Sequence, residues 1–328
     1  MPIKERILNQ LFAYTLTGTL LLTGGCGYNT KAPQAESPKK TEPSLQAEQH
    51  PLSGKVFSMI SGTQISYAEL LKQLRNSRFI LVGEKHDNPE HHRLELQLLQ
   101  DLQNGTKTRL VLEMLDEQQG ENIPKLSATS SESEIKTLLN WSDSSWPWQD
   151  YGPLISSALK DGNQLKAGNL SKPLLMQIYK KGLPDQPRLA TVSDIPQTIR
   201  STIQQQVFES HCQAIPMEQM GPMTSIQLSR DASMAYALSD QLGKQMQAIL
   251  ITGAFHARKD TGVPQHLKKL TSKAVVSILL TETDDALTTA AEAISSNAGV
   301  ADYIWFTSRS EKKDYCASLR QQPPKKDD

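Results

Sequence analysis

The chain has 328 residues, of which 35 are Lys or Arg and 35 are Asp or Glu, so its formal net charge at pH 7 is zero. This balance, without any long basic run, argues against binding to nucleic acid, which proteins contact mainly through clustered Lys and Arg side chains. Apart from two polar ends, roughly 260 residues remain, which is enough for one substantial core or for a domain with an insertion.

The first 25 residues have the pattern of a lipoprotein signal peptide. Two basic side chains precede an uncharged stretch with an apolar centre at residues 20–22, and small residues then lead to Cys26. This order is typical of an exported chain, and the stretch is too polar for a membrane span of ~20 apolar residues. We expect cleavage before Cys26, lipid on that cysteine, and a periplasm-facing anchor, with the outer membrane favoured by Gly27. An ordinary cleaved signal is the alternative, because Thr23 stands where lipoprotein signals usually carry Leu.

Polar segments flank the expected folded region. Residues 26–50 and 311–328 are rich in Pro, Ser, Gln and charge, so they cannot bury enough apolar surface to fold. We expect a disordered tether at the start and a polar tail at the end. Once lipid occupies Cys26, Cys212 and Cys316 remain in an oxidising compartment where they are able to pair. Their spacing does not decide whether they do.

Short apolar runs then alternate with amphipathic segments along the chain. The runs expected to be strands are residues 78–83, 109–114, 165–169, 248–253, 274–280 and 303–306. A helix is expected after the first run, with Asp87 as its N-cap and Pro89 in its first turn, and another over residues 154–160. Strands that are apolar throughout are buried on both faces. The predicted fold class is therefore α/β, with a mainly parallel sheet flanked by helices.

Residues 171–242 contain no segment with the pattern of a strand, and helical patterns fill most of this range. We predict a smaller all-helical subdomain here, inserted into an α/β domain made of residues 51–170 and 243–310. Met217, Met220 and Met223 lie in this region. They either fill gaps in a flexible loop or line the apolar face of a ligand.

Polar side chains suited to binding a ligand follow three of the predicted strands. They are Glu84, Lys85, His86, Glu113, His256, Arg258 and Lys259. In open α/β sheets, ligands bind beyond the carboxyl ends of the strands. Two Gly-x-x-His units, at residues 83–86 and 253–256, together with the two glutamates have the composition of a divalent metal site. Spacing alone supports metal or cofactor binding about as well as it supports ordinary surface polar residues.

Three of the four tryptophans lie between residues 141 and 148. Trp141, Trp146 and Trp148 precede Tyr151 in a chain that has few other aromatic side chains. One interpretation is a buried aromatic plug. The other is an exposed aromatic lid that stacks on a planar ligand.

These segments together resemble the ChaN family of haem-binding lipoproteins, in a larger group that includes Tiki metalloproteases and erythromycin esterases. The resemblance rests on the order and spacing of residues 83–88, 91–92, 112–113, 146–153, 167–170, 211–212, 230–235, 253–256 and 262–267. It implies an α/β domain with a smaller helical domain, and a homodimer that encloses two haems face to face. It also implies a tyrosinate from one subunit on each iron, and a His and a Lys from the other subunit on the propionates.

Carried over to this sequence, the resemblance implies specific residues. Tyr151 best matches the iron ligand, with Tyr179 and Tyr236 as alternatives. The implied propionate and cofactor contacts come from His86 with Lys85, from His256 with Arg258 or Lys259, and from Trp148. A phenolate is a hard anion that prefers ferric iron, whereas a free tyrosine titrates near about 10. Ferric haem is therefore the implied cofactor.

Two functions remain open from the sequence. The favoured one is a haem-binding lipoprotein that acts in iron or haem acquisition with an envelope uptake component, rather than an enzyme. The other is a metal-dependent hydrolase that uses Mn or Co with Glu84, His86, Glu113 and His256. The aromatic segment favours the first, because a planar cofactor uses it and a hydrolase does not need it. A binding module for another envelope protein is a third, less specific hypothesis.

Overall fold

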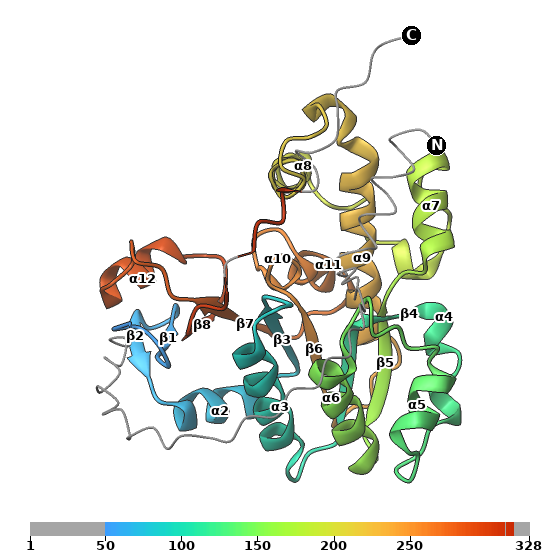
Figure 1. Ribbon diagram of the computed structural model, residues 1–328, viewed down its shortest axis with the longest axis horizontal. Helices are drawn as coiled ribbons and strands as arrows, with labels where there is room; N and C mark the ends of the chain where they lie inside the picture. Colours follow the sequence, from blue (N-terminus) through green and yellow to red (C-terminus); the bar gives the residue numbers. More distant parts are fainter. Residues whose placement is uncertain (1–49, 312, 318–328) are drawn as a thin grey trace, which may run out of the picture.

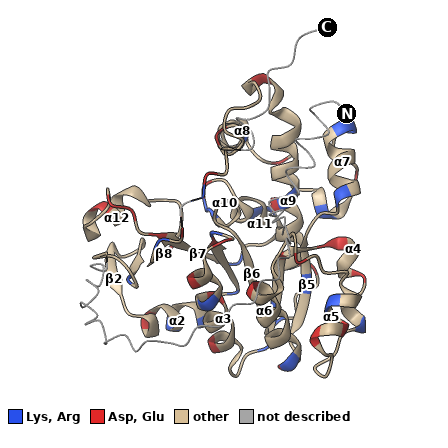
Figure 2. Ribbon diagram, viewed as in Figure 1, with Lys and Arg blue, Asp and Glu red and all other residues tan. Residues whose placement is uncertain are grey.

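The computed structural model describes residues 50–311 and 313–317 (Figure 1). The predicted signal peptide, Cys26 and nearly all of the predicted tether lie outside these residues, as does most of the polar tail. Within the described ranges, no helix combines the length and the apolar character that a membrane crossing needs. Acidic and basic residues are distributed over many of the described helices and loops (Figure 2).

Eight strands form one sheet in the order β2-β1-β8-β7-β3-β6-β4-β5. They are β1 (Val56–Ser58), β2 (Thr63–Ile65), β3 (Phe79–Glu84), β4 (Thr108–Asp116), β5 (Gln164–Asn169), β6 (Gln247–Gly253), β7 (Val275–Glu282) and β8 (Tyr303–Thr307). The six strands from β8 to β5 are parallel, and β1 runs antiparallel to β8 and β2 at one edge. The predicted α/β fold with a mainly parallel sheet is confirmed.

Helices cover both faces of this sheet (Figure 1). They are α2 (Tyr67–Arg75), α3 (Pro89–Gln103), α4 (Glu117–Gly120), α5 (Glu132–Leu138), α6 (Trp148–Lys160), α7 (Lys172–Lys181), α8 (Gln197–Ser210), α9 (Gly221–Ser239), α10 (Ala254–Ala257), α11 (Val263–Leu270) and α12 (Ala290–Ser296), with short 3-10 turns η1 (Ile123–Lys125), η2 (Pro187–Leu189) and η3 (Met217–Gln219). Apolar side chains of α2, α3, α5 and α6 pack on one face, and those of α9, α11 and α12 pack on the other. Each Leu that is fully buried in this way stabilises the folded state by roughly 1.5–3 kcal/mol.

Two predicted helix starts were wrong. The N-cap of α3 is Asn88, whose side chain accepts from the amide of Glu90 at 2.9 Å, and not Asp87. Pro89 prefers the first helical position, which puts the cap directly before it. Helix α6 begins at Trp148 and runs through Pro153, rather than starting at residue 154. Trp148 and Tyr151 therefore belong to the first turns of a helix.

The helices between residues 171 and 242 share a core of their own. Met220 and Met223 are buried inside it, and Met217 packs against it. Met220 and Met223 thus fill space inside this core, whereas a role of these methionines in lining a macrocycle stays a prediction. Helix α9 belongs to this core and also packs on the sheet. The division into two domains stays a prediction.

Cys212 and Cys316 form a disulfide, which answers a question that the sequence left open. Their Cα atoms lie 5.8 Å apart, although the residues are separated by 104 positions in the chain. The bond joins the segment after α8 to the C-terminal segment that follows β8.

Candidate functional site

Strands β3, β6 and β4 are neighbours in the sheet, and their carboxyl ends bring together the residues that the sequence singled out. Glu84 ends β3, Glu113 lies near the end of β4, and Gly253 ends β6. Parallel strands place these ends on one edge, which we call the rim. Gly253 leaves room for His86 there, because a Cβ atom at this position would lie 2.8 Å from Nε2 of His86.

Glu84 is the centre of the first polar group in the rim. Its Oε1 accepts hydrogen bonds from Nδ1 of His86 at 2.9 Å and from the hydroxyl of Tyr151 at 2.9 Å. Nε2 of His92 lies 3.0 Å from Oε2. Burial raises the pKa of the Glu84 carboxyl, but the imidazoles of His86 and His92 have a larger, opposite effect. The net pKa is lowered to about 2. Glu84 is therefore a buried carboxylate that three side chains hold in place.

Glu113 is the centre of the second group. Its Oε2 accepts from the hydroxyl of Thr252 at 2.6 Å and from the amide of Gly253 at 2.8 Å. Nε2 of His256 lies 3.4 Å from Oε1, and Nδ1 of His256 lies 2.6 Å from Asp231. Burial lowers the pKa of His256, but the two carboxylates raise it to about 10. His256 is thus an imidazolium held between two buried acids.

His86 joins the two groups and is their most exposed member. Its Nδ1 contacts Glu84, its Nε2 lies 3.9 Å from Glu113, and 38% of its side chain is exposed. The ring packs edge-on against Trp146, with centroids 5.0 Å apart. Burial lowers the pKa of His86, while the hydrogen bond to Glu84 and the charges of Glu84 and Glu113 raise it to a net higher value. An imidazole whose Nδ1 is held by a carboxylate presents Nε2 to a ligand.

The aromatic segment is mainly a buried plug and not an exposed lid. Trp148 and Tyr151 are buried, and Trp141 packs edge-on against Trp148 at 5.3 Å between centroids. Trp146 is half-buried and packs on Tyr151 as well as on His86. Burial and the nearby carboxylates, Glu84 first among them, raise the pKa of the Tyr151 phenol. Tyr151 is therefore a neutral hydrogen-bond donor in this arrangement.

The three candidate propionate cations outside the two groups are partly exposed, and each has an acidic partner. Nζ of Lys85 donates to both carboxylate oxygens of Glu282, at 3.0 and 3.1 Å. Arg258 pairs with Asp260 at 2.6 Å, and Lys259 pairs with Asp302. An anionic ligand would have to compete with these carboxylates.

Among the described residues, no group of three or more His, Cys, Asp or Glu side chains is placed to hold a metal ion. Glu84, His86, Glu113 and His256 do come together, but they bond to one another and to neighbouring side chains. The Mn or Co alternative gains no support from this arrangement. Sequence reasoning did not assign roles to His92 and Asp231, which belong to the two groups. The only sequence signal for Asp231 was its place in the resemblance.

A family model described as haem-binding uptake, Tiki superfamily, ChaN, matches residues 70–267. Among solved structures, the chain is similar to one titled "Cofacial heme binding to ChaN of Campylobacter jejuni", with 20% identity and a TM-score of 0.60 over 76% of this chain and 95% of that one. A mutant erythromycin esterase EreC in its open conformation matches with 13% identity and a TM-score of 0.41, over 69% of this chain and 77% of that one. No curated protein matches the chain.

Proposed function

This chain belongs to the ChaN family of haem-binding uptake proteins in the Tiki superfamily, and from this membership we propose that it binds haem at the rim. The observation that carries the proposal is the match over residues 70–267, which contains Glu84, His86, Glu113 and His256. The fold agrees, because a solved ChaN structure covers most of the chain. Haem supplies a planar apolar surface, an iron centre and two propionate anions, and each needs a matching group.

Several side chains at the rim fit a haem. Phe255 follows Gly253 by two residues and is 54% exposed, which is unusual for a large apolar side chain next to buried polar groups. His86 offers a partly exposed imidazole close to Gly253. We propose that Phe255 contacts the macrocycle and that His86, with Lys85, binds a propionate. His256 fits this role less well, because both of its ring nitrogens face carboxylates.

A tyrosinate on ferric iron is the finer part of the proposal. In this conformation Tyr151 does not fit an iron atom, because it is fully buried and its hydroxyl donates to Glu84. Ligation by Tyr151 therefore requires that its hydroxyl exchange Glu84 for the iron, with movement of the first turns of α6. Tyr179 and Tyr236 are half-buried, and among the described tyrosines only Tyr315 is exposed, at 41%.

Titration of the full chain with haemin tests both parts. We expect a saturable change in haem absorption, with the spectrum of a ferric tyrosinate, and we expect Tyr151→Phe to remove that spectrum. Tyr179→Phe and Tyr236→Phe are matched controls, since each removes one hydroxyl elsewhere. Retention of the spectrum in Tyr151→Phe and its loss in one control would move the ligand to that tyrosine. An unchanged haemin spectrum in the wild-type chain would overturn haem binding itself.

We further propose a homodimer that encloses two haems, a lipid on Cys26, and a periplasm-facing location in which an envelope uptake component exchanges haem with the protein. The signal pattern before Cys26 supports the anchor. Sedimentation with and without haemin measures the fraction of the protein that is dimeric. Labelling with a fatty acid, expected in the wild type and absent in Cys26→Ser, measures the anchor.

A second function has one observation in its favour, namely that the structure brings together two pairs of a carboxylate and an imidazole. Nδ1 of His86 is held by Glu84, which leaves Nε2 as the ring nitrogen to act as a base on a substrate water. Such a site suits hydrolysis of an ester or amide. Hydrolysis of a model ester that is lost in His86→Ala and retained in Lys85→Ala would support this function. Equal background rates in all three proteins would exclude it for that substrate.

A further inference from the structure

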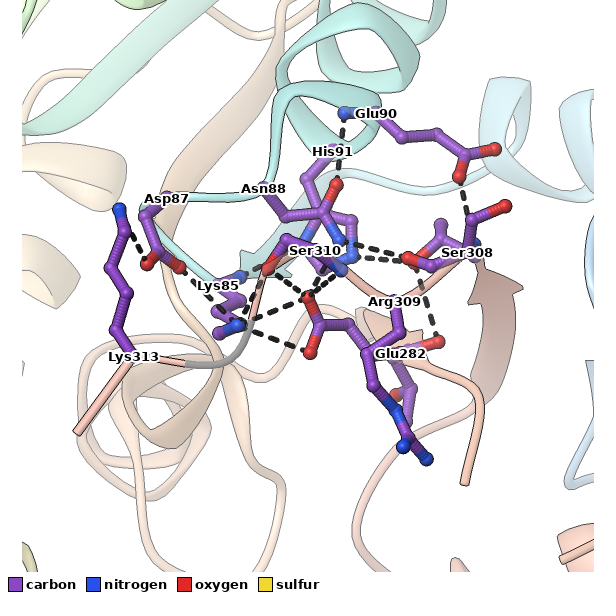
Figure 3. Close-up of polar contacts among 12 residues, drawn as sticks. Lys85, Asp87, Asn88, Glu90, His91, Glu282, Ser308, Arg309, Ser310 and Lys313 are labelled. Atoms are coloured by element: carbon purple, nitrogen blue, oxygen red, sulfur yellow. Dashed lines mark hydrogen bonds and ion pairs between the residues drawn. The ribbon is translucent and has the colours of Figure 1, made fainter. Parts of the chain in front are cut away.

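The C-terminal segment after β8 lies against the loop that connects β3 to α3. We call residues 308–311 and 313–317 the strap, and residues 85–88 the loop. The amide of Ser308 donates to Glu90 at 2.8 Å, and the amide of Ser310 donates to Glu282 at 2.9 Å. Figure 3 shows Glu282 in contact with Lys85, Asn88 and Ser310, and Glu90 in contact with Ser308. The strap is therefore bonded to α3 and to β7 on either side of the loop.

The loop itself bonds to the strap through three side chains. Nζ of Lys85 donates to the hydroxyl of Ser310 at 2.7 Å, and Nδ2 of Asn88 donates to the carbonyl of Ser308 at 3.1 Å. Asp87 lies 3.2 Å from Nζ of Lys313 (Figure 3) and accepts a hydrogen bond from the hydroxyl of Tyr315. The loop that carries Lys85 and His86 is thus held partly by residues from the far end of the chain.

A covalent bond closes the strap. Cys316 follows Tyr315 directly and is joined to Cys212. The strap is therefore fixed at both ends, by β8 in the sheet and by the disulfide to the segment after α8. A tether at both ends keeps Lys313 and Tyr315 at a high effective concentration beside Asp87. Both cysteines are partly exposed, so a dithiol in solution has access to them.

The strap also sets the charge around Lys85. With the strap in place, Lys85 and Lys313 balance the carboxylates of Asp87 and Glu282. Without it, Lys85 alone faces both carboxylates, which lie 3.4 and 3.0 Å from its Nζ, and the cluster has an excess of one negative charge. A carboxylate ligand is less favoured next to a negatively charged cluster than next to a neutral one.

We propose that the strap is a redox-controlled part of the haem-binding rim. With the disulfide closed, the strap holds the loop and keeps the surroundings of Lys85 neutral toward the propionates. A dithiol reductant opens it: two electrons and two protons pass to the sulfurs, the S–S bond breaks, two thiols form, and the dithiol becomes a disulfide. The released strap no longer supports the loop, and haem binds more weakly. This inference rests on the proposed binding of haem.

The main test compares haemin binding by the oxidised full chain, by the same chain reduced with dithiothreitol and desalted, and by Cys316→Ser. We expect the dissociation constant to rise roughly tenfold in the last two, the scale of one hydrogen bond to a charged group. Cys212→Ser breaks the same bond and must give the same result. Tyr315→Phe keeps the disulfide and removes one hydroxyl, so its effect should be smaller. All forms carry Cys26→Ser, so that no third thiol can exchange with Cys212 or Cys316.

A second measurement needs no haem. Hydrogen exchange at the amides of Ser308 and Ser310 reports their bonds to Glu90 and Glu282, and protection should fall on reduction while the amides of β3 and β6 stay protected. Loss of protection in those strands would identify a folding defect in a variant. In that case, the haemin affinity of the reduced chain tests the strap proposal. Equal haemin affinity in the oxidised and reduced chains overturns the strap proposal alone. No haemin binding by any form overturns the proposed function and this inference together.

Discussion

The hydroxyl of Tyr151 donates to Oε1 of Glu84 at 2.9 Å, and neither side chain has appreciable access to solvent. The same oxygen accepts from Nδ1 of His86. One carboxylate therefore connects a strand end, the first turns of α6 and the imidazole that reaches the surface. We therefore expect a change at any of the three to alter the orientation of His86.

Replacement of Glu84 should be costly. Glu84→Ala leaves His86, His92 and Tyr151 without their shared acceptor, and breaking a buried ionic pair costs about 3–5 kcal/mol. Urea denaturation monitored by tryptophan fluorescence measures this loss. Glu121→Ala, at an exposed position, is the matched control and should change the free energy of unfolding by less than about 0.5 kcal/mol. If Glu84→Ala lowers the free energy of unfolding no more than the control does, Glu84 is not an important shared acceptor.

His256 should make the free energy of unfolding fall as the pH becomes alkaline. Burial lowers the pKa of His256, but Glu113 and Asp231 outweigh this effect and raise it from 6.5 to about 10 in the folded chain. A raised pKa on a base stabilises the fold fully below the unfolded value, and this stabilisation is lost as pH rises through the folded value. The free energy of unfolding should therefore decline between pH 6.5 and 10. His256→Gln should flatten that decline, whereas an equal decline in both proteins would assign it to other groups.

Arg109 should be important for attaching α9 to the sheet. It is almost fully buried, and its guanidinium donates to the carbonyls of Ala237 and Asp240, at 3.1 and 2.7 Å, at the end of that helix. Arg109→Met removes the donor from the buried carbonyls of Ala237 and Leu238, and each buried carbonyl left without a partner costs roughly 1–3 kcal/mol of stability. Chemical denaturation should show a loss of at least this size. Arg93→Met, whose side chain is 63% exposed, provides the comparison and should be nearly neutral.

Replacement of Gly253 should affect haemin binding more than the stability of the fold. A Cβ atom here meets Nε2 of His86 at 2.8 Å, and the ring is the end of a flexible, partly exposed side chain. Gly253→Ala should displace His86 and weaken haemin binding by roughly tenfold, with little change in the unfolding midpoint. Gly221→Ala, with no atom within 4 Å of the added methyl group, is the control. Unchanged haemin affinity in Gly253→Ala would argue against a contact between His86 and the ligand.

The sequence alone determined the sheet and the location of the rim. All six parallel strands were predicted. Strands such as β3 and β6 are apolar runs buried on both faces, whereas β5 is a short segment in which Gln164 and Lys166 are exposed. The strands β1 and β2 were missed, since each has three residues and β2 is largely exposed. Glu84, Glu113 and the two Gly-x-x-His units were expected to converge, because the ends of parallel strands share one edge.

Only the tertiary structure decided how individual side chains are used. The direction of Tyr151 depends on where α6 begins and how it packs, so the sequence did not reveal that its hydroxyl faces Glu84. The pairing of Cys212 with Cys316 depends on bringing together positions that are 104 residues apart. Local patterns determine which residues form strands and helices. Contacts between distant segments depend on the packing of the whole chain, and these contacts set the protonation and orientation of the candidate site.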